Sequence, residues 1–363
     1  MKVAICIPNL NIGGAEKSLV SIAEYLHDRN HDVTIVVSSH NGRQNNFLLK
    51  DGIKFTSLNK KRVITSILEL GRFMKAHKPD VVISGITHMN EMVILSKLIH
   101  LQSHYLIIRE SMIHTLKPRG FLKKLDRLAL RMLYKRANRM LCVSEYSRKN
   151  LDSIGVTNKN TSVFYTPVWD SEAALAAKAP LPPNFSYLGD IPFLVAVGRL
   201  NTVKNYKFML KSFAGTTKNI PHKLVLIGDG RLKDDLRGYA DALGIGSRVV
   251  FAGYQTNPLA FVSRASLFLQ TSFHEAGSRA LIEAMCLGIT PVIVDKSGSE
   301  FTGYGRYGIV LKTHDEAMYS KLICDAINTP SLNKCDIMNY AQKMFSAEAQ
   351  ISKLESFFPP SAQ

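Results

Sequence analysis

Short apolar runs alternate with longer stretches of helical periodicity along the first half of the chain. The runs have the length of strands, and the stretch Ala15–Leu26 between two of them places Leu19 and Leu26 on one face of a helix. The strand-type runs are Lys2–Pro8, Asp32–Val37, Asp80–Ser84, Tyr105–Arg109 and Met140–Ser144. This alternation predicts an α/β domain with a parallel, doubly wound sheet, whose ligands bind at the carboxyl ends of the strands.

The same alternation starts again near residue 191. Its strand-type runs are Phe193–Val197, Leu224–Ile227, Val249–Ala252, Leu267–Thr271 and Pro291–Asp295. The stretch 171–190 is rich in alanine and proline and has no consistent period, which is typical of a linker. A chain of 363 residues has the length of two domains. We therefore predict a first domain at 1–170, a linker at 171–190, a second domain at 191–340 and a C-terminal helical segment at 341–363.

One helix of the second half is unusual because it has almost no polar face. Ser278 can cap this helix, and Gly288 can end it after Leu287. Residues 280–287 are apolar except for Glu283. A helix that is apolar all round is buried, and a buried carboxylate without a partner is costly. Either a neighbouring cation or a bound ligand must therefore hydrogen-bond the side chain of Glu283.

The composition is that of a globular protein with a large core, with 46% hydrophobic and 21% charged residues. The five cysteines are scattered and match no metal or redox spacing, so we expect reduced thiols in a cytoplasmic protein. The first residues lead directly into a strand, without the apolar segment of a signal peptide. No window of the sequence approaches the run of about 18 apolar residues that a membrane-spanning helix needs.

The formal net charge of +17 is concentrated in the first half of the chain. Residues 1–170 hold 26 lysines and arginines against 13 aspartates and glutamates. Such an asymmetry indicates contact between this half and an anionic surface or polymer.

The densest basic segment is 117–139, which has the spacing of an amphipathic helix. Its basic stripe consists of Lys123, Arg127, Arg131 and Lys135, with Lys124 and Arg139 beside it. We expect the other side to pack on the sheet; it holds Leu122, Leu125, Ala129, Met132 and Leu133. A solvated charged face would show the same pattern, but we favour docking on anionic lipid headgroups, where each cation contributes about 1 kcal/mol. Nucleic acid is disfavoured because no aromatic stacking platform or known binding motif accompanies the charge.

A glycine pair, Gly13-Gly14, lies where the first strand leads into the first helix. The N-terminus of a helix favours anions, so this turn is a candidate phosphate contact. However, the segment matches neither GxGxxG nor the Walker pattern. A purely structural tight turn between strand and helix therefore explains the glycine pair as well as a phosphate contact does.

Several segments, taken in order, resemble one known family. They are IGGAE at 12–16, VSEYSRKNL at 143–151, VGRLNTVKN at 197–205, LIGDGRLKDDL at 226–236, VVFAGY at 249–254 and TSFHEAGSRALIEAMCLGITPVI at 271–293. Their order and spacing resemble the retaining glycosyltransferases of the group 1 (GT4-like) family, most specifically in the Glu-x7-Glu pair of Glu275 and Glu283. The resemblance covers nearly the whole chain. It implies the α/β GT-B fold, with two Rossmann-like domains facing a central cleft and a C-terminal helix that crosses back to the first domain.

The resemblance also implies roles for individual residues. Arg199 and Lys204 would grip the diphosphate of a nucleotide sugar and neutralise the charge of the leaving group, so that no metal cofactor is expected. Glu275 would lie beside the donor sugar, and Glu283 would accept hydrogen bonds from the ribose of the nucleotide. Further donor contacts are expected at Gly198, Tyr254, Gly277, Ser278 and Arg279 of the second domain and at Gly13 and Gly14 of the first.

The sequence departs from the family pattern at three places. Ala276-Gly277-Ser278 follows Glu275 where many relatives have Gly-Phe, which leaves the donor sugar open. Ser111 stands where many relatives have a histidine, and Thr166 replaces the common asparagine before the hinge proline. The acceptor-side group therefore stays open among His88, Arg109, Glu110 and Ser111.

The resemblance implies transfer of a hexose or N-acetylhexosamine, with retention, from a UDP-sugar to a membrane-anchored glycan acceptor of bacterial cell-surface polysaccharide or lipopolysaccharide synthesis. Together with the basic segment, it predicts a cytoplasmic enzyme peripherally associated with the inner face of the cell membrane, with no nucleic-acid partner. Two alternatives remain: a nucleotide-sugar epimerase of similar two-lobe fold, and a non-enzymatic basic protein that binds membranes or nucleic acid.

Overall fold

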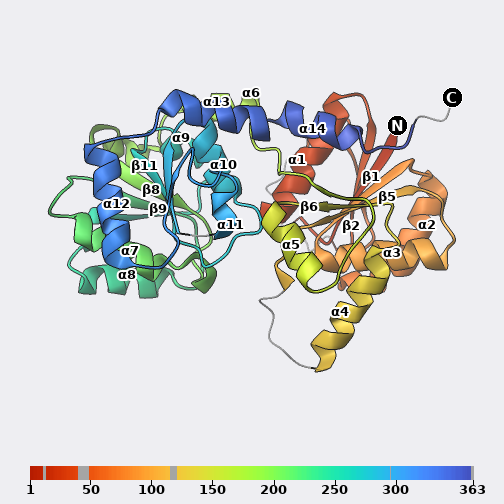
Figure 1. Cartoon of the computed structure of the whole chain (residues 1–363). Coiled ribbons are helices and arrows are strands. Elements are labelled where there is room, and N and C mark those ends of the chain that lie inside the picture. Colours follow the sequence, from red (N-terminus) through yellow and green to blue (C-terminus); the bar gives the residue numbers. More distant parts are fainter. Residues whose placement is uncertain (11–13, 40–48, 115–120, 295, 361–363) are drawn as a thin grey trace. The chain divides into compact units, whose positions relative to one another are not determined.

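The computed structural model describes residues 1–10, 14–39, 49–114, 121–294 and 296–360, without the side chains of 121–124, 296 and 297. The chain forms two compact units. The first consists of Met1–Pro167 and Ala347–Gln363, and the second of Val168–Ser346 (Figure 1).

The first unit is built on a parallel sheet of seven strands in the order β3-β2-β1-β4-β5-β6-β7. The strands are β1 (Lys2–Ile7), β2 (Asp32–Val37), β3 (Lys54–Ser57), β4 (Val81–Gly85), β5 (Tyr105–Glu110), β6 (Arg139–Cys142) and β7 (Thr161–Val163). From β1 the chain first forms β2 and β3 on one side of this strand, and then crosses over to form β4 on the other side. This is the doubly wound arrangement that the sequence predicts, with its switch point between β1 and β4.

Helices cover both faces of this sheet. They are α1 (Gly14–Asp28), η1 (Val63–Ser66, a 3-10 helix), α2 (Ile67–His77), α3 (Thr87–Ile99), α4 (Phe121–Tyr134), α5 (Glu145–Ser153) and α14 (Ala347–Glu355). Alternate residues of β1 point to opposite faces, so that Val3 and Ile5 join one core cluster while Ala4 and Cys6 join the other. The first cluster includes residues of α1 and α14, and the second includes residues of α2, α3, α4 and α5.

The second unit has a parallel sheet of six strands in the order β10-β9-β8-β11-β12-β13. The strands are β8 (Phe193–Val197), β9 (Lys223–Ile227), β10 (Val249–Gly253), β11 (Leu267–Gln270), β12 (Thr290–Ile293) and β13 (Ile309–Val310). The helices are α6 (Ser171–Lys178), α7 (Tyr206–Thr216), α8 (Lys233–Ala242), α9 (Leu259–Val262), α10 (Arg279–Cys286), α11 (Lys296–Ser299), α12 (Glu316–Asn328) and α13 (Lys334–Phe345), with the 3-10 helices η3 (Pro183–Asp190), η4 (Thr202–Lys204) and η5 (Gly246–Arg248). The switch point of this sheet lies between β8 and β11.

The stretch 171–190 is ordered rather than an irregular linker. It forms α6 and η3 and packs on α9, where Asn257 Nδ2 donates to Ala176 O at 2.7 Å and the rings of Phe185 and Phe261 meet edge to face at 5.4 Å. The periodicity missed α6 because Ala177 is the one residue of this helix that is fully buried. The side chain of Asp170 caps the helix by accepting from Ala173 N at 2.7 Å.

The C-terminal segment is two helices rather than one. α13 ends at Phe345 in the second unit, Ser346 has extended backbone, and α14 belongs to the first unit. Two carboxylate oxygens of Glu355 hold α14 there, since they lie 2.7 Å from Arg29 Nη1 and 3.0 Å from His31 Nε2.

Candidate active site

The loops at the carboxyl ends of β8 and β11 meet at the switch point of the second unit. This is where doubly wound sheets bind ligands, because the chain leaves the two neighbouring strands in opposite directions. The first loop carries Gly198, Arg199 and Lys204, and the second carries Glu275. The sequence segments with the strongest family resemblance therefore lie at the expected edge of the sheet.

An ion pair joins the two loops. Lys204 Nζ lies 2.6 Å from Glu275 Oε1, and Ser272 Oγ donates to the same oxygen at 2.6 Å. The two charged side chains are 23% and 12% exposed, so they are shielded by protein and still open to a ligand. The structure thus brings together two residues, 71 positions apart, that the sequence analysis places in catalysis.

Backbone contacts fix the geometry of this pair. Thr271 Oγ1 donates to Lys204 O at 3.0 Å, and Phe273 N donates to Val203 O at 2.9 Å. Asn201 begins the turn that carries the lysine, because its side chain accepts from Lys204 N at 3.2 Å. These bonds join the two loops independently of the charged side chains.

Arg199 and Tyr206 flank the pair in different ways. The side chain of Arg199 is exposed and is open to an anionic ligand at the mouth of the site. Tyr206 is buried, and its hydroxyl donates to Gly198 O at 3.2 Å. Burial raises the pKa of Tyr206, and the negative charge of Glu275 raises it further, so that this hydroxyl remains a donor.

The predicted burial of Glu283 is confirmed, and its partner in this structure is a neighbouring cation. Arg279 Nε lies 2.7 Å from Glu283 Oε1, one turn earlier on α10. The helix ends at Cys286 and is followed by Gly288 in the left-handed conformation (φ 71°), as expected. Ser278 precedes the helix but does not cap it, because its hydroxyl donates to the side chain of Gln270 at the end of β11 instead.

Glycines let the loop after β9 pack directly against the loop after β8. A Cβ atom on Gly228 would lie 2.1 Å from Gly198 O, and one on Gly230 would lie 2.4 Å from Leu200 O. Gly228 also has φ 134°, which side chains rarely allow. Beyond this turn, Tyr254 follows β10 with an exposed ring. Gly277 is also exposed, so that the expected donor contacts of the second unit surround the carboxyl ends of β8, β10 and β11.

The residues of the first unit that the sequence analysis proposed as acceptor-side or donor contacts differ in their exposure to solvent. His88 lies on α3 with its side chain exposed, 3.5 Å from Glu91, and Ser111 is half-buried. Arg109 and Glu110 are buried at the end of β5, where Arg109 Nη2 donates to Thr166 Oγ1 at 2.6 Å. Gly14 begins α1, with no neighbouring atom within 4 Å of a Cβ built there, whereas Gly13 lies outside the described residues.

Glu110 is the centre of a buried network that the sequence analysis missed. Its carboxylate accepts from Tyr134 and from the amides of Ser111 and Met112, and lies 3.4 Å from His114 Nε2. Burial raises the pKa of Glu110, but His114, Tyr134 and the Met112 amide together outweigh this effect and hold the pKa below its usual value. Only His114 could have been suspected from the sequence, because the other side-chain partners come from distant segments.

The orientation predicted for the basic helix is wrong. α4 docks through Leu130 and Tyr134, which are buried, whereas Leu125, Leu128 and Met132 are 49%, 51% and 64% exposed. Ala129 is exposed as well. The side of α4 that packs on the core is centred on Leu130 and Tyr134, with Leu133 beside them, so Met132 points away from it. The N-terminal part of the helix also projects beyond the sheet of its unit (Figure 1).

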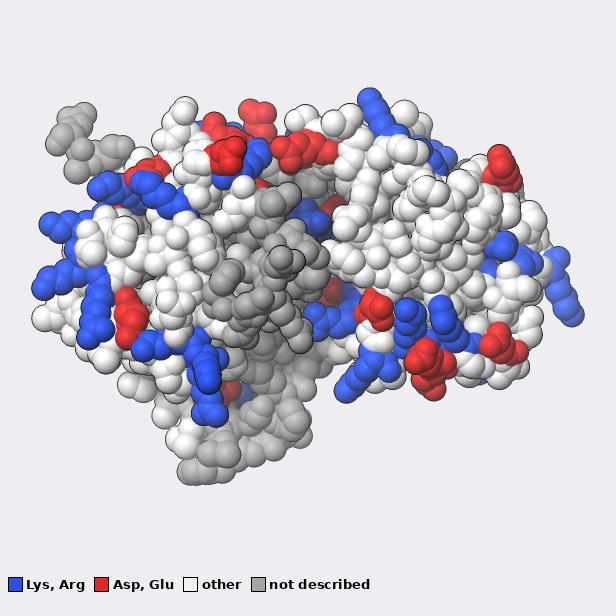
Figure 2. Space-filling model, turned by 180° about the vertical axis from the view of Figure 1, so that it is seen from behind, with Lys and Arg blue, Asp and Glu red and all other residues white. Residues whose placement is uncertain are grey.

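The basic residues of this helix share its exposed face in part. Arg127 is half-buried, and Arg131 is exposed although its Nε donates to Ile154 O at 2.6 Å. Lys135, the first residue after the helix, is exposed as well. The side chains of Lys123 and Lys124 lie outside the described residues. Figure 2 shows further Lys and Arg side chains along the outer edge of the first unit, on the left in that view.

The described ranges contain neither a candidate membrane span nor a candidate metal cluster. None of their helices combines the length and hydropathy that a membrane span requires. None of their His, Cys, Asp and Glu side chains form a cluster of three or more that could hold a metal ion.

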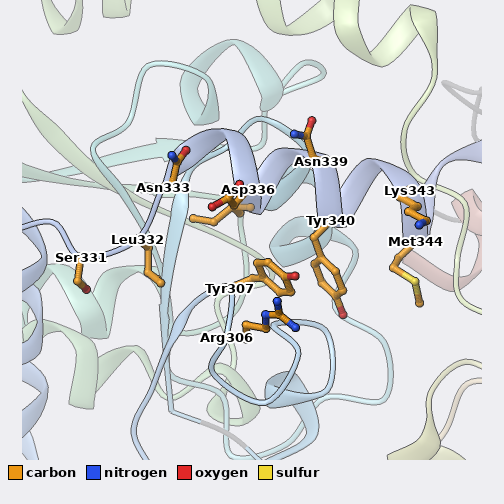
Figure 3. Close-up of a pocket in the computed structure, with 11 residues that line it drawn as sticks. Arg306, Tyr307, Ser331, Leu332, Asn333, Asp336, Asn339, Tyr340, Lys343 and Met344 are labelled. Atoms are coloured by element: carbon orange, nitrogen blue, oxygen red, sulfur yellow. The ribbon is translucent and has the colours of Figure 1, made fainter.

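A hollow of about 670 Å³ lies elsewhere on the second unit, between α13 and the loop before β13 (Figure 3). Its wall is a stack in which the rings of Tyr307 and Tyr340 lie 4.0 Å apart, with the guanidinium of Arg306 over Tyr307 at 5.3 Å. None of the residues predicted to bind a donor or an acceptor lines it.

Comparison with known proteins identifies the class. The family model "Glycosyl transferases group 1" matches residues 187–344, and "Glycosyltransferase Family 4" matches residues 12–171. Together they cover the two units in the order that the sequence motifs imply. The chain belongs to the group 1, GT4-like glycosyltransferases.

Individual relatives agree with this assignment. An α-1,4-N-acetyl-D-galactosaminyltransferase of Campylobacter jejuni, named for GalNAc-α-(1→4)-GalNAc-α-(1→3)-diNAcBac-PP-undecaprenol, is 26% identical over 364 residues, 94% of this chain and 93% of its own. An uncharacterized glycosyltransferase of Methanocaldococcus jannaschii is 24% identical over 276 residues, 69% of this chain and 68% of its own. The crystal structure of Anabaena HepE in complex with UDP and glucose matches with a TM-score of 0.82 at 18% identity, covering 98% of both chains, and shows that the fold is GT-B.

Proposed function

We propose that the protein is a retaining glycosyltransferase that transfers a hexose or N-acetylhexosamine from a UDP-sugar to a lipid-linked glycan. The observation that carries the proposal is the pair of Lys204 and Glu275 at the switch point of the second unit. A fixed cation and a fixed carboxylate, held together by backbone bonds, suit a reaction in which a negatively charged diphosphate leaves a sugar.

In this proposal Lys204 and Arg199 stabilise the leaving group. Lys204 is held in place by Glu275, whereas Arg199 is exposed and can fold over a bound diphosphate. A guanidinium binds two phosphate oxygens at once, and the ammonium adds a point charge beside the bond that breaks. These two cations supply the positive charge that the departing UDP requires, so the proposed reaction needs no metal ion.

The two glutamates would hold the rest of the donor. Glu275 accepts from Ser272 and Lys204 through Oε1, and its carboxylate would bind hydroxyls of the donor sugar. Arg279 engages Oε1 of Glu283, and Oε2 of the same carboxylate would accept from the ribose. Both carboxylates are partly shielded from water, which strengthens such hydrogen bonds.

The acceptor is proposed to be a glycan on a lipid diphosphate. The name of the Campylobacter jejuni relative gives an undecaprenol-linked oligosaccharide as that enzyme's acceptor, and the match extends over 94% of this chain. A lipid-linked acceptor requires the enzyme to work at a bilayer surface.

We place the membrane contact of the enzyme on α4. The helix exposes Leu125, Leu128 and Met132 together with Arg131, and Lys135 is exposed directly after it. This combination is typical of helices that lie in a membrane interface. The exposed apolar side chains would enter the boundary between headgroups and acyl chains while the cations meet anionic lipid. The enzyme would then associate peripherally with the inner face of the cell membrane.

The test is transfer from a panel of UDP- and GDP-sugars to an undecaprenyl-diphosphate-linked, GalNAc-terminated oligosaccharide in detergent micelles. Lys204→Ala and Glu275→Ala should each lower the transfer rate by about 10²-fold or more, the usual effect of losing one electrostatic contact to a transition state. Retention is read from the anomeric configuration of the new linkage by NMR.

The matched control is Lys207→Ala, which removes a lysine from another ion pair of the same unit. Lys207 Nζ lies 2.9 Å from Asp235 Oδ2 on the exposed surface of α7, so the ion pair of this lysine does not involve Glu275. Its loss should leave transfer unchanged. Full activity of the Lys204 and Glu275 variants would overturn the proposal, and interconversion of the free sugar nucleotide without acceptor would indicate an epimerase instead.

A further inference from the structure

The first unit contains a buried charged network that the proposed donor chemistry does not use. Its centre is Glu110, the last residue of β5, whose side chain is fully buried. A buried carboxylate is costly unless several donors satisfy it, so its presence at the end of a strand calls for a structural or functional reason.

The donors come from both sides of the carboxylate. Oε1 accepts from the backbone amides of Ser111 and Met112, each at 2.9 Å. Oε2 accepts from Tyr134 OH at 2.5 Å, and Thr87 Oγ1 lies 3.1 Å from both oxygens. One side chain thus holds the start of the loop after β5, the first residue of α3 and the last residue of α4.

The network continues beyond the carboxylate. Asn90 Nδ2 lies 3.1 Å from Arg109 O and 3.4 Å from Tyr134 OH, and it therefore ties α3 to the end of β5. Asn158 Nδ2 donates to Tyr134 O at 2.8 Å. His114 is buried beside the carboxylate, and its backbone N donates to Asn150 Oδ1 at 2.9 Å. The loop 111–114 is therefore anchored at both of its ends.

The loop 111–114 lies at the edge of the first sheet where doubly wound folds bind ligands. β5 lies next to β4, and both strands end on the same edge of the sheet, beside the switch point between β1 and β4. Loops at this edge contact ligands in doubly wound folds. The same carboxylate also holds α4, the helix that we place at the lipid surface.

We propose that Glu110 is a positioning residue, which fixes the acceptor-side loop Ser111–His114 relative to the lipid-facing helix α4. This inference rests on the proposed function, because it assigns the loop to the acceptor. Glu110 is itself too deeply buried to touch a substrate. It acts by keeping the amides of Ser111 and Met112 at a fixed distance from Tyr134, so that a lipid-anchored acceptor meets a loop in one defined place.

The main variant is Tyr134→Phe, which removes one hydrogen bond and keeps the ring that fills the core. It should raise the KM for the undecaprenyl-diphosphate-linked acceptor about tenfold, with little change in kcat or in the KM for the donor, because small displacements at a site cost this much or more. Glu110→Gln should have the same signature and a larger effect, since its amide group would meet the donors Thr87 and Tyr134.

The matched control is Tyr319→Phe in the second unit. Tyr319 is also fully buried, and its hydroxyl donates to Val292 O at 2.6 Å, so that the two variants lose comparable bonds. Equal shifts of acceptor KM in both tyrosine variants would mean that lost stability, and not positioning, is the cause. That result would overturn the inference.

A second measurement needs no substrate. Amide hydrogen exchange at Ser111 and Met112 should be slow in the wild-type protein and at least about tenfold faster in Glu110→Ala, because both protecting bonds end on Oε1 of the side chain, which this variant removes. Unchanged exchange would overturn the proposal even if Glu110→Gln lowers activity. If wild-type protein transfers no sugar, the proposed function fails while the exchange result still decides whether Glu110 holds the loop.

Discussion

Arg279 Nε lies 2.7 Å from Oε1 of Glu283, one turn away on the same helix. The helix is otherwise apolar and buried, so Arg279 supplies the cation that partners this carboxylate inside the second unit. A ligand that binds Glu283 would therefore find a carboxylate that is already oriented.

The two members of this pair should respond differently to substitution. Arg279→Leu leaves a buried carboxylate without its cation and should lower the free energy of unfolding by about 3 kcal/mol, measured by urea denaturation. Glu283→Gln keeps the shape of the side chain and should cost less stability, but it should weaken UDP binding about tenfold, since a charged acceptor for the ribose is lost. Unchanged UDP affinity in Glu283→Gln, measured by calorimetry, would assign this glutamate a structural role only.

The exposed apolar residues of α4 predict lipid binding that survives high salt. Leu128→Gln combined with Met132→Gln should weaken binding to anionic vesicles about tenfold at an ionic strength that screens the lysines and arginines. Charge reversal at Arg127 and Lys135 should instead weaken binding at low salt. Sedimentation with vesicles measures both effects.

A matched control for this experiment is Leu175→Gln. Leu175 is an exposed leucine on α6 of the second unit, so it reports the general effect of removing surface apolar area. It should leave vesicle binding unchanged. Equal binding by the wild-type protein and the α4 double variant at high salt would argue against insertion of this helix.

A buried histidine makes the first unit sensitive to mild acid. Burial, together with the charge of Lys97, lowers the pKa of His104 from 6.5 to about 4. Between these values the unfolded chain binds a proton at His104 that the folded chain does not. The contribution of neutral, buried His104 to the free energy of unfolding is therefore fully present above pH 6.5 and is lost as the pH falls towards 4.

The loss amounts to about 2 kcal/mol between pH 7 and pH 5. In His104→Gln, the difference in unfolding free energy between these two pH values should shrink by this amount. Denaturant unfolding at both pH values measures it, and an identical pH dependence in the two proteins would contradict the prediction.

Two glycines of the second unit should respond in opposite directions to the same change. Gly228→Ala places a Cβ against Gly198 O in a backbone conformation that alanine avoids, and it should cost about 2 kcal/mol or more and weaken UDP binding. Gly238→Ala meets no atom within 4 Å in α8 and should stabilise by about 0.5–1 kcal/mol. Thermal unfolding of both variants, with and without UDP, checks the contrast.

Patterns that are local in the sequence predicted the structure well. The sequence gives two parallel, doubly wound sheets, because buried strands and amphipathic helices differ in their periods. The burial of Glu283 was predictable because all other residues of 280–287 are apolar. The family resemblance, in turn, indicated that Lys204 and Glu275 belong to one site.

Features that depend on partners from elsewhere in the chain were not predictable. The face of α4 was assigned wrongly because apolar residues occur around much of the helix, and the sequence does not show that Leu130 and Tyr134, rather than Leu125 and Met132, meet the core. The network of Glu110 joins Thr87, Ser111 and Tyr134, and no spacing in the sequence relates these positions. The hydroxyl of Ser278 has an alternative partner, Gln270, that appears only when β11 and α10 are placed side by side.

The docking of α14 has a consequence for how the chain is made. Ile351 and Leu354 complete the core around β1 and α1, so the first unit is finished by residues that follow the whole second unit in the sequence. During translation, the core around β1 and α1 therefore stays partly uncovered until the second unit and α14 have left the ribosome. The second unit, which is continuous in sequence from 168 to 346, has no such delay. A truncation that removes α14 should therefore damage the folding of the first unit more than that of the second.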